Sequence, residues 1–222
     1  MKEKEYSDLY NDKLPDYYEN AREDIVSFIP KKAKYILDVG CGTGTFGKLL
    51  KEKDSNLIVW GVEPNKMAAK IAIENLDKVF NSIFNEELNF QNQNFDCICF
   101  NDVLEHLINP KAALDCALKF LNSNGCIIAS IPNVRCYTVL KDLIWHGEWK
   151  YKKSGILDAT HVRFFTKQSI YRLFKESGLK IISLQTMGKV NSRLLKLIGL
   201  FRLKKFNDIS YEYFVVQSMK ND

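Results

Sequence analysis

Short apolar runs alternate with helix-like periodic patterns between residues 16 and 131. Five runs have the length and continuity of strands buried in a sheet, and most of the stretches between them carry apolar residues every three or four positions. The predicted strands are 34–39, 57–62, 79–84, 95–100 and 126–131, and the predicted helices are 16–29, 45–53, 65–75 and 110–121, with a turn at 122–125. This alternation implies right-handed β-α-β units and a mostly parallel sheet with helices on both faces.

The pattern changes after Asn133. Residues 134–165 are rich in Trp, Tyr, Arg and His, and they separate the fifth strand from the next clear helix. The later elements are a helix at 167–177, a strand at 179–185, a basic apolar helix at 191–200 and a last strand at 211–219. We therefore predict an α/β, Rossmann-like, doubly wound fold with a seven-stranded, mostly parallel sheet. We expect one domain over 1–222, with a flexible N-terminus at 1–15.

Polar loops or side chains lie at the carboxyl ends of four of the predicted strands. They are Asp38, Glu63, the pair Asn101-Asp102 and the pair Pro132-Asn133. Parallel sheets bind ligands beyond the carboxyl ends of their strands, at the point where the strand order reverses. The sequence therefore predicts a binding crevice at this edge of the sheet.

A glycine-rich loop follows the first strand, with the sequence Asp38-Val39-Gly40-Cys41-Gly42-Thr43-Gly44. Glycines let the backbone adopt positive φ and let a ligand approach bare main chain, and the start of the next helix offers free N–H groups to an anion. A structural turn without a ligand is an alternative. The glycines 42, 44 and 47 also fit the dinucleotide pattern G-x-G-x-x-G, which keeps an NAD enzyme open.

Glu63 ends the second strand, 25 residues after Asp38. A carboxylate at this place can accept both hydroxyls of a ribose, which is the interpretation that we favour; the alternative is an acid that interacts with the dipole of a helix start. Because NAD enzymes share a ribose acid, Glu63 does not decide the cofactor. Asp38 favours S-adenosylmethionine (SAM), because a carboxylate beside the loop could hold an ammonium group and would be badly placed beside a pyrophosphate.

Several segments resemble the motifs of class I SAM-dependent methyltransferases. The glycine loop resembles motif I, Gly61 to Asn65 resembles the segment after it, 95–107 with its Leu-Glu-His resembles motif II, and 121–133 resembles motif III. The resemblance implies the class I methyltransferase fold, SAM as cofactor and S-adenosylhomocysteine (SAH) as product. The cofactor-binding residues that it implies are Asp38, Gly40, Cys41, Gly42, Gly44, Glu63, Pro64, Asn101, Asp102 and Val103.

The stretch 147–166 contains the string Asp158-x-Thr-His161-x-Arg163-Phe-Phe-Thr166. It resembles methyltransferases encoded among, or fused to, the glycosyltransferases of surface-polysaccharide synthesis. By that resemblance 134–165 is an insertion on the acceptor side. The candidate catalytic residues are His161 as general base, Asp158 to orient it and Arg163 to hold the acceptor, because histidine titrates near neutral pH. A structural alternative gives His161 only a hydrogen-bonding role and Thr166 the N-cap of the next helix.

Asp102, Glu105 and His106 have a spacing that can place them on one side of a helical turn. Carboxylates and an imidazole could bind a divalent metal there, as in some relatives with Glu-x-x-Glu-His. The first acid is Asp in this chain. We assign no metal and favour a helix cap with a packed His106.

The composition is ordinary for a globular protein, with 46% hydrophobic residues and a net charge of +5 spread along the chain. It argues only weakly for nucleic acid, and we expect none as a partner. We see no secretory signal and no apolar run of the ~18 residues that span a bilayer. The six cysteines form no C-x-x-C pair, so we expect buried reduced thiols in a cytoplasmic protein and no zinc site.

The first functional hypothesis is methyl transfer from SAM to a hydroxyl of a sugar or a glycan-lipid precursor, a small-molecule acceptor. The second is an O-methyltransferase that acts on a quinone precursor, with a metal in some versions. The third is a non-catalytic SAM-binding partner of a glycosyltransferase. An RNA methyltransferase is disfavoured, because the charge is diffuse.

Overall fold

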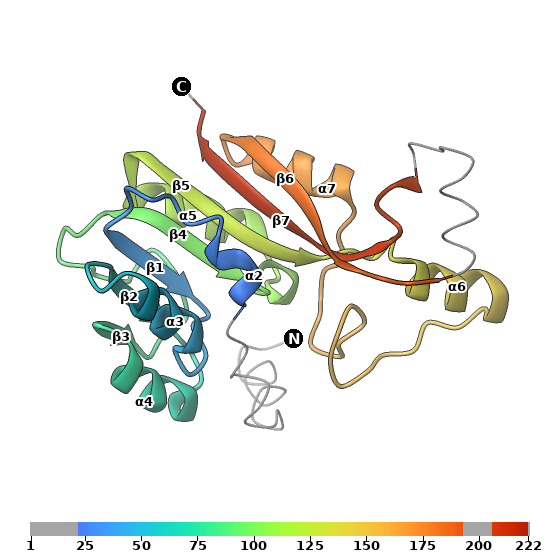
Figure 1. The fold of residues 1–222 in the computed structure, drawn as a ribbon, viewed down its shortest axis with the longest axis horizontal. Helices are drawn as coiled ribbons and strands as arrows, with labels where there is room; N and C mark the ends of the chain where they lie inside the picture. Colours follow the sequence, from blue (N-terminus) through green and yellow to red (C-terminus); the bar gives the residue numbers. More distant parts are fainter. Residues whose placement is uncertain (1–21, 193–205, 222) are drawn as a thin grey trace.

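The computed structural model describes residues 22–192 and 206–221. Within them, seven strands form one sheet in the order β3-β2-β1-β4-β5-β7-β6 (Figure 1). Their bounds are β1 Tyr35–Val39, β2 Ile58–Val62, β3 Lys78–Phe80, β4 Phe95–Asn101, β5 Leu121–Pro132, β6 Leu179–Lys189 and β7 Tyr211–Lys220. The pairs from β3 to β5 are all parallel, whereas β7 runs antiparallel to both β5 and β6. The predicted α/β, seven-stranded, mostly parallel sheet is confirmed.

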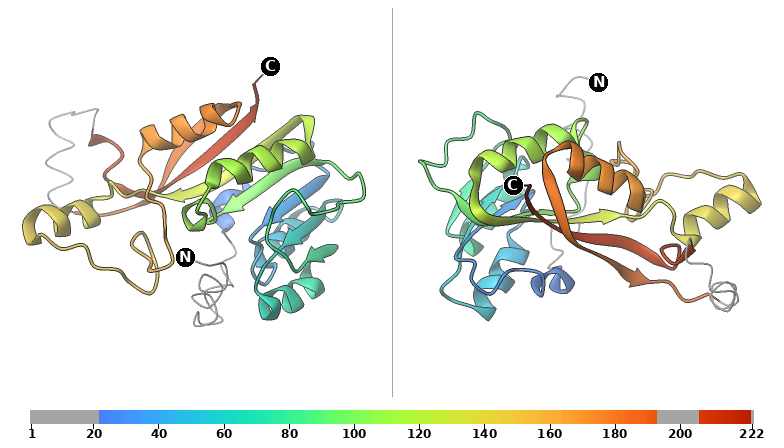
Figure 2. Two further views of the ribbon diagram at one scale, coloured as in Figure 1. Left: turned by 180° about the vertical axis from the view of Figure 1, so that it is seen from behind. Right: turned by 90° about the horizontal axis from the view of Figure 1, so that it is seen from above.

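Helices cover both faces of the sheet, as the view from above shows (Figure 2). α2 (Glu23–Val26), α3 (Thr45–Lys53) and α4 (Lys66–Asn75) bury apolar residues against one face. α5 (Pro110–Phe120) and α7 (Lys167–Glu176) do the same on the other face. The apolar residues of the central strands are divided between the two cores, because successive side chains of a strand point to opposite faces.

Aromatic rings fill the core between β2, β3 and β4. Phe90, from the loop before β4, is 2% exposed and lies 4.7 to 6.3 Å, centroid to centroid, from four other rings. These rings belong to Trp60, Phe80, Phe95 and Phe120. Most of the contacts are edge-to-face, the arrangement that aromatic quadrupoles favour.

Cys97 and Cys99 share one face of β4, because alternate residues of a strand point to the same side, and their sulfurs are 3.7 Å apart. Cys126 of the neighbouring strand lies 3.7 Å from the Cys97 sulfur. All six cysteines are free and buried, as predicted.

Some predicted boundaries were wrong. The turn expected at 122–125 belongs to β5, because Leu121 already pairs with Phe95 and the Asn122 amide donates to Asp96 at 2.7 Å. The third strand ends at Phe80 instead of at residue 84. Helix α4 begins at Lys66, one residue later than predicted, because Asn65 is its N-cap.

The ends of the chain and the insertion also differ from the pattern. In the described part of 16–29, only Glu23–Val26 is α-helical. The insertion 134–165 contains a helix that periodicity did not reveal, α6 (Tyr137–His146). The predicted helix 191–200 lies almost entirely outside the described residues. No helix within 22–192 and 206–221 has the length and apolarity needed to cross a bilayer.

Candidate active site

The glycine loop lies at the carboxyl end of β1, where the sequence predicts a binding crevice. Gly40 and Gly44 have φ values of +70° and +78°, a conformation that other residues rarely adopt. A Cβ on Gly40 would lie 2.7 Å from Cγ2 of Val103, which follows β4. The loop is therefore pressed against the end of β4, and both features require glycine at position 40.

Glu63 lies at the end of β2 and links this loop to helix α4. Its carboxylate accepts from Gly42 N at 2.9 Å and from Asn65 N at 2.7 Å, and the residue is 4% exposed. Burial raises the pKa of the Glu63 carboxyl, and the two backbone donors oppose that rise. Each oxygen keeps a lone pair for a further donor, so a ribose diol fits this carboxylate.

Asp38 is almost completely buried at the end of β1. Burial, reinforced by the negative charge of Glu63, raises the pKa of Asp38 to about 8. The Asn101 amide lies at the limit of hydrogen bonding, 3.5 Å from Asp38 Oδ1. Asn101 Oδ1 is itself buried and has no hydrogen-bond partner among the described residues. Buried acceptors without donors are costly, so this corner fits a cationic group that donates hydrogen bonds.

Asp102 follows β4 in a strained left-handed conformation, with φ 54°. Ser130, fully buried on β5, holds it there: Asp102 N donates to Ser130 Oγ at 2.8 Å, and that hydroxyl donates to Asp102 Oδ1 at 2.9 Å. The other carboxylate oxygen accepts from the Arg22 guanidinium. Arg22 also lies over the Tyr213 ring, 4.6 Å from its centroid. A buried cation therefore stands beside the crevice.

The string around His161 packs directly on the Leu-Glu-His motif. Val162 N and Arg163 N both donate to the Glu105 main-chain oxygen, at 3.0 and 2.9 Å. The Arg163 guanidinium donates twice to the Ile108 carbonyl, at 3.2 and 2.6 Å. The short 3₁₀ helix Leu104–His106 and the segment 156–165 therefore form a single structural unit.

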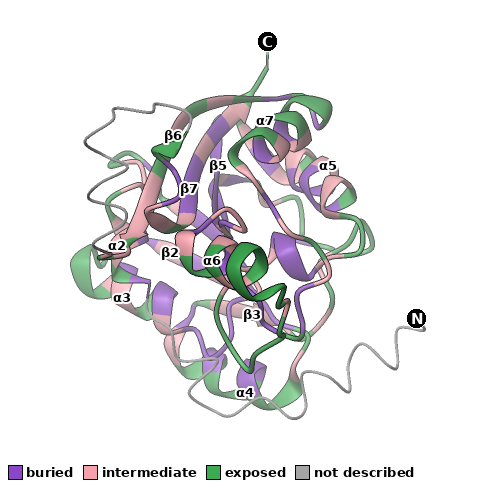
Figure 3. Cartoon of the chain, turned by 90° about the vertical axis from the view of Figure 1, so that its right-hand side faces the viewer, coloured by how far each residue is buried: buried purple, intermediate pink, exposed green. Residues whose placement is uncertain are grey.

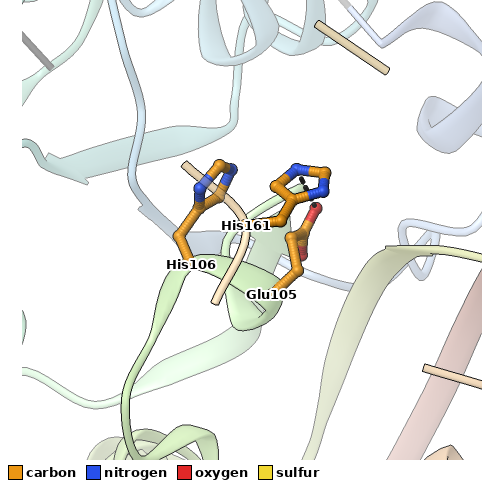
Figure 4. Close-up of side chains that lie close together, drawn as sticks. All are labelled: Glu105, His106 and His161. Atoms are coloured by element: carbon orange, nitrogen blue, oxygen red, sulfur yellow. Dashed lines mark ion pairs between the residues drawn. The ribbon is translucent and has the colours of Figure 1, made fainter. Parts of the chain in front are cut away.

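Glu105, His106 and His161 converge in this unit (Figure 4). One ligand atom from each lies within 4.8 Å of the others, and all three residues are buried. His161 Nε2 is 3.9 Å from Glu105 Oε1, and the two imidazole rings meet edge to face at 4.6 Å. Neither Glu105 oxygen has a hydrogen-bond partner in the described part of the chain.

Both imidazoles bond a backbone carbonyl through Nδ1. His161 Nδ1 lies 2.9 Å from Ile156 O, and His106 Nδ1 lies 3.2 Å from Thr160 O. Because a carbonyl can only accept, Nδ1 carries the proton in each neutral ring and Nε2 keeps its lone pair.

Burial, with the nearby His161, lowers the pKa of His106 to about 4. Burial and then the charge of Asp102 raise the pKa of Glu105 well above its usual range. The cluster thus gathers acceptors that need a proton or a metal ion between them.

The other two predicted catalytic residues, Asp158 and Arg163, make hydrogen bonds that hold the local structure. Asp158 Oδ1 accepts from Thr160 N at 2.8 Å and from Thr160 Oγ1 at 2.7 Å, which shapes the turn before His161. Arg163 is exposed and fixes Ile108, as described above. Asn133, after the fifth strand, is fully buried, and its amide donates to Asp208 O and Tyr211 O.

An aromatic group covers the outer side of the cluster. Phe164 lies 5.2 Å from Trp149 and 6.4 Å from His161, centroid to centroid. Tyr151, 6.3 Å from Phe164, is 52% exposed. The insertion therefore places aromatic faces beside His161.

Comparison with known proteins identifies the family. A family model described as a methyltransferase domain matches residues 10–184. The chain belongs to this methyltransferase family. An uncharacterized protein of Methanocaldococcus jannaschii is 28% identical to the methyltransferase over 98% of this chain and 88% of its own length. The ubiquinone biosynthesis O-methyltransferase of Dictyostelium discoideum is 28% identical over 55% of this chain and 42% of its own length.

Solved structures share the fold of the methyltransferase. A SAM-dependent methyltransferase from Archaeoglobus fulgidus has a TM-score of 0.68 at 18% identity, covering 89% of this chain and 91% of that one. The plantazolicin methyltransferase BpumL, in complex with a desmethylPZN analog and SAH, has a TM-score of 0.65 at 17% identity, with coverages of 98% and 95%. The predicted fold and the predicted class, a SAM-dependent methyltransferase, are confirmed by the family match together with these folds.

Sequence reasoning missed two residues of the candidate site, Arg22 and Ser130, and one contact, that of Glu105 with His161. Arg22 precedes a very short helix, and no local motif marks it. Ser130 lies inside an apolar run, where its hydroxyl looked like a gap in the pattern. Glu105 was noticed, but its convergence with His161 across 56 positions has no local signal, since it depends on how the insertion folds back.

Proposed function

We propose that this methyltransferase binds SAM in the crevice at the carboxyl ends of β1, β2 and β4 and methylates a hydroxyl group of a sugar or a glycan-lipid precursor. The single observation that carries the choice of a hydroxyl is the Glu105, His106 and His161 cluster, in which Nδ1 of both rings bonds a backbone carbonyl and Nε2 carries the lone pair of the neutral ring. An alcohol must lose a proton when it is methylated, and these side chains are arranged to take one.

The crevice offers a partner for each polar part of the cofactor. Glu63 would accept from the ribose hydroxyls, and Asp38 with Asn101 would hold the ammonium group. Arg22, which already pairs with Asp24 and Asp102, would add a contact to the carboxylate of the methionine part. The loop at Gly40 would bring bare backbone against the ligand. Pro64 and Cys41 would contribute only to the shape of this wall.

The cofactor supplies a methyl group activated on a sulfonium, so the protein mainly positions the acceptor and removes its proton. His161 Nε2 would take that proton, and the Nδ1–H bond to Ile156 O fixes the ring for this task. Glu105 Oε1 lies 3.9 Å from His161 Nε2, so the ionised form of Glu105 would pair with the imidazolium. Asp158 adds negative charge nearby, which also acts on His106 and Glu105.

The proposal of a sugar or glycan-lipid acceptor is supported by two features. The Asp-x-Thr-His-x-Arg-Phe-Phe-Thr string resembles methyltransferases of surface-polysaccharide synthesis, and Trp149 and Tyr151 supply aromatic faces. Exposed aromatic rings stack on the apolar faces of sugars, and the Arg163 guanidinium has donors beyond those used on Ile108. These residues would bind the acceptor next to His161.

Transfer of a labelled methyl group from SAM to a pool of extracted glycan precursors tests the proposal. We expect His161→Ala to lower kcat by about 100-fold or more, within the range for lost general-base catalysis, while SAH binding stays within twofold of wild type. His146→Ala, in the exposed third histidine, is the matched control and should retain full activity. A kcat within threefold of wild type in His161→Ala would remove the base role. SAH binding without transfer to any acceptor would favour a non-catalytic partner.

A metal-assisted O-methyltransferase acting on a quinone precursor is the second candidate. It is favoured by the same cluster. The Nδ1–H groups of the two imidazoles bond backbone carbonyls, and this leaves their Nε2 atoms oriented as metal ligands. Glu105 Oε1, His106 Nε2 and His161 Nε2 would form the set. Activity lost in EDTA and restored by Mg²⁺ or Mn²⁺, with Glu105→Gln failing to recover, would establish this version. Full activity in EDTA would exclude it.

A further inference from the structure

Helix α6 carries an apolar surface that the described residues leave uncovered. Only Val139 of the helix is buried, whereas Leu143, Ile144 and Trp145 are 43%, 67% and 65% exposed. Figure 3 shows the second half of the helix standing in front of the sheet in the colour of exposed residues. Tyr151, on the loop after the helix, extends this surface. Side chains of this size rarely gather on a solvated surface without a partner.

Lysines are frequent in the same stretch of the sequence as these apolar side chains. Residues 137–155 contain Lys141, Lys150, Lys152 and Lys153 against only two acids, Asp142 and Glu148. Lys141, Lys150 and Lys152 are exposed, and Asp142 is half-buried. A short amphipathic surface with tryptophan, aliphatic side chains and lysines is the combination that binds the interface of an anionic bilayer.

We propose that the α6 surface, formed by Leu143, Ile144, Trp145, Tyr151 and the lysines at 141, 150 and 152, docks the enzyme on an anionic phospholipid membrane. Trp145 and Ile144 enter the headgroup boundary, and the lysines lie against the lipid phosphates. The attachment is peripheral, since α6 has ten residues and cannot span a bilayer.

This surface is connected to the candidate active site by short links. Lys152 N donates to Leu157 O at 2.8 Å, and Ala159 N donates to Lys152 O at 2.9 Å. Trp149 packs on Phe164, which lies beside His161. Docking would therefore place the mouth of the site at the lipid surface, where a lipid-linked acceptor resides. The docking itself does not depend on the proposed function, but this use of it does.

Sedimentation with vesicles tests the docking without SAM or an acceptor. We expect the wild-type chain to sediment with vesicles of 70% phosphatidylcholine and 30% phosphatidylglycerol in 100 mM salt, and to bind pure phosphatidylcholine at least tenfold more weakly. Ile144→Ser/Trp145→Ser should lower the affinity at least tenfold, and Lys150→Glu/Lys152→Glu should remove most of its salt dependence. Met67→Ser/Ile71→Ser is the matched control, because these exposed α4 residues should leave binding unchanged.

Three results would overturn the proposal. They are no sedimentation of the wild type with anionic vesicles, equal sedimentation of the Ile144→Ser/Trp145→Ser variant, and a dimer in light scattering that this variant converts to a monomer. SAH calorimetry on the same variant separates these outcomes from a failure of the active site, and we expect its affinity within twofold of wild type. If the wild type did not bind SAH, the proposed function would be refuted and the docking result would be unaffected.

Discussion

The burial of Asp38 makes binding of SAH pH-dependent in a way that can be calculated. With a pKa of about 8 in the free protein, Asp38 is neutral in most molecules at pH 7. A ligand ammonium group needs the ionised carboxylate, so binding must release one proton. The ionised fraction is about 1% at pH 6 and about 9% at pH 7, and the affinity for SAH should therefore rise about ninefold over that interval.

Calorimetry measures this linkage directly. We expect the SAH dissociation constant to fall by about ninefold from pH 6 to pH 7. The observed enthalpy should differ between phosphate and Tris by the ionisation heat of about 0.9 proton. Asp38→Asn should bind weakly and show no slope with pH. Asp54→Asn, in the exposed acid after α3, should keep the wild-type slope. A change below twofold in the wild type would refute the reasoning, because an Asp with its ordinary pKa is fully ionised at both pH values.

The folding stability of the ligand-free protein should also depend on pH through Asp38. The pKa of Asp38 is higher in the folded protein than in the unfolded chain, so the folded state binds this proton more tightly. The contribution to stability is complete below pH 4 and is lost as the pH rises through 8. We expect the melting temperature of the wild type to fall, relative to that of Asp38→Asn, between pH 5 and pH 8. Parallel curves for the two proteins would contradict this account.

Three further substitutions test the local geometry. Gly40→Ala should cost about 1–3 kcal/mol in urea unfolding and weaken SAH binding, because its Cβ meets Val103 at positive φ. Phe90→Ala should cost about 3–5 kcal/mol by emptying the ring cluster. Arg163→Lys should lower kcat and leave the SAH affinity unchanged, because an ammonium group cannot reproduce the two hydrogen bonds that the guanidinium donates to Ile108 O.

Each of these has an outcome that would count against it. Normal stability and SAH binding in Gly40→Ala would mean that the loop can move away from Val103. A loss below about 1 kcal/mol in Phe90→Ala would mean that the surrounding rings collapse into the space. Unchanged kcat in Arg163→Lys would separate the Ile108 contact from catalysis.

The sequence was sufficient where one local pattern determined the structure. Alternating apolar runs and glycines predicted β1, the loop after it and Glu63 at the end of β2, because strand, turn and helix signals are all local there. The capping box that begins α7 was partly foreseen through Thr166, whose side chain accepts from Ser169 N. These elements form the half of the site that would bind the cofactor.

The other half depends on contacts between distant segments. The Leu-Glu-His motif and the segment around His161 were read separately, and the bonds from Val162 N and Arg163 N to Glu105 O unite them. The turn at 122–125 was mispredicted because Asp96 holds this stretch in the sheet: it accepts from Asn122 and from the backbone of Lys34 and Tyr35. Long-range partners of this kind override local turn preference.

The buried thiols of Cys97, Cys99 and Cys126 make transient opening of the fold measurable by chemical labelling. These sulfurs lie on one face of the sheet, in the buried core shared with residues of α2, α3 and α4, so a thiol reagent in solution meets them only when this face of the sheet opens. Their labelling rate therefore follows the rare openings of the sheet. An occupied crevice, which joins β1, β2 and β4 at one edge, would slow that labelling in proportion to how firmly the ligand is held.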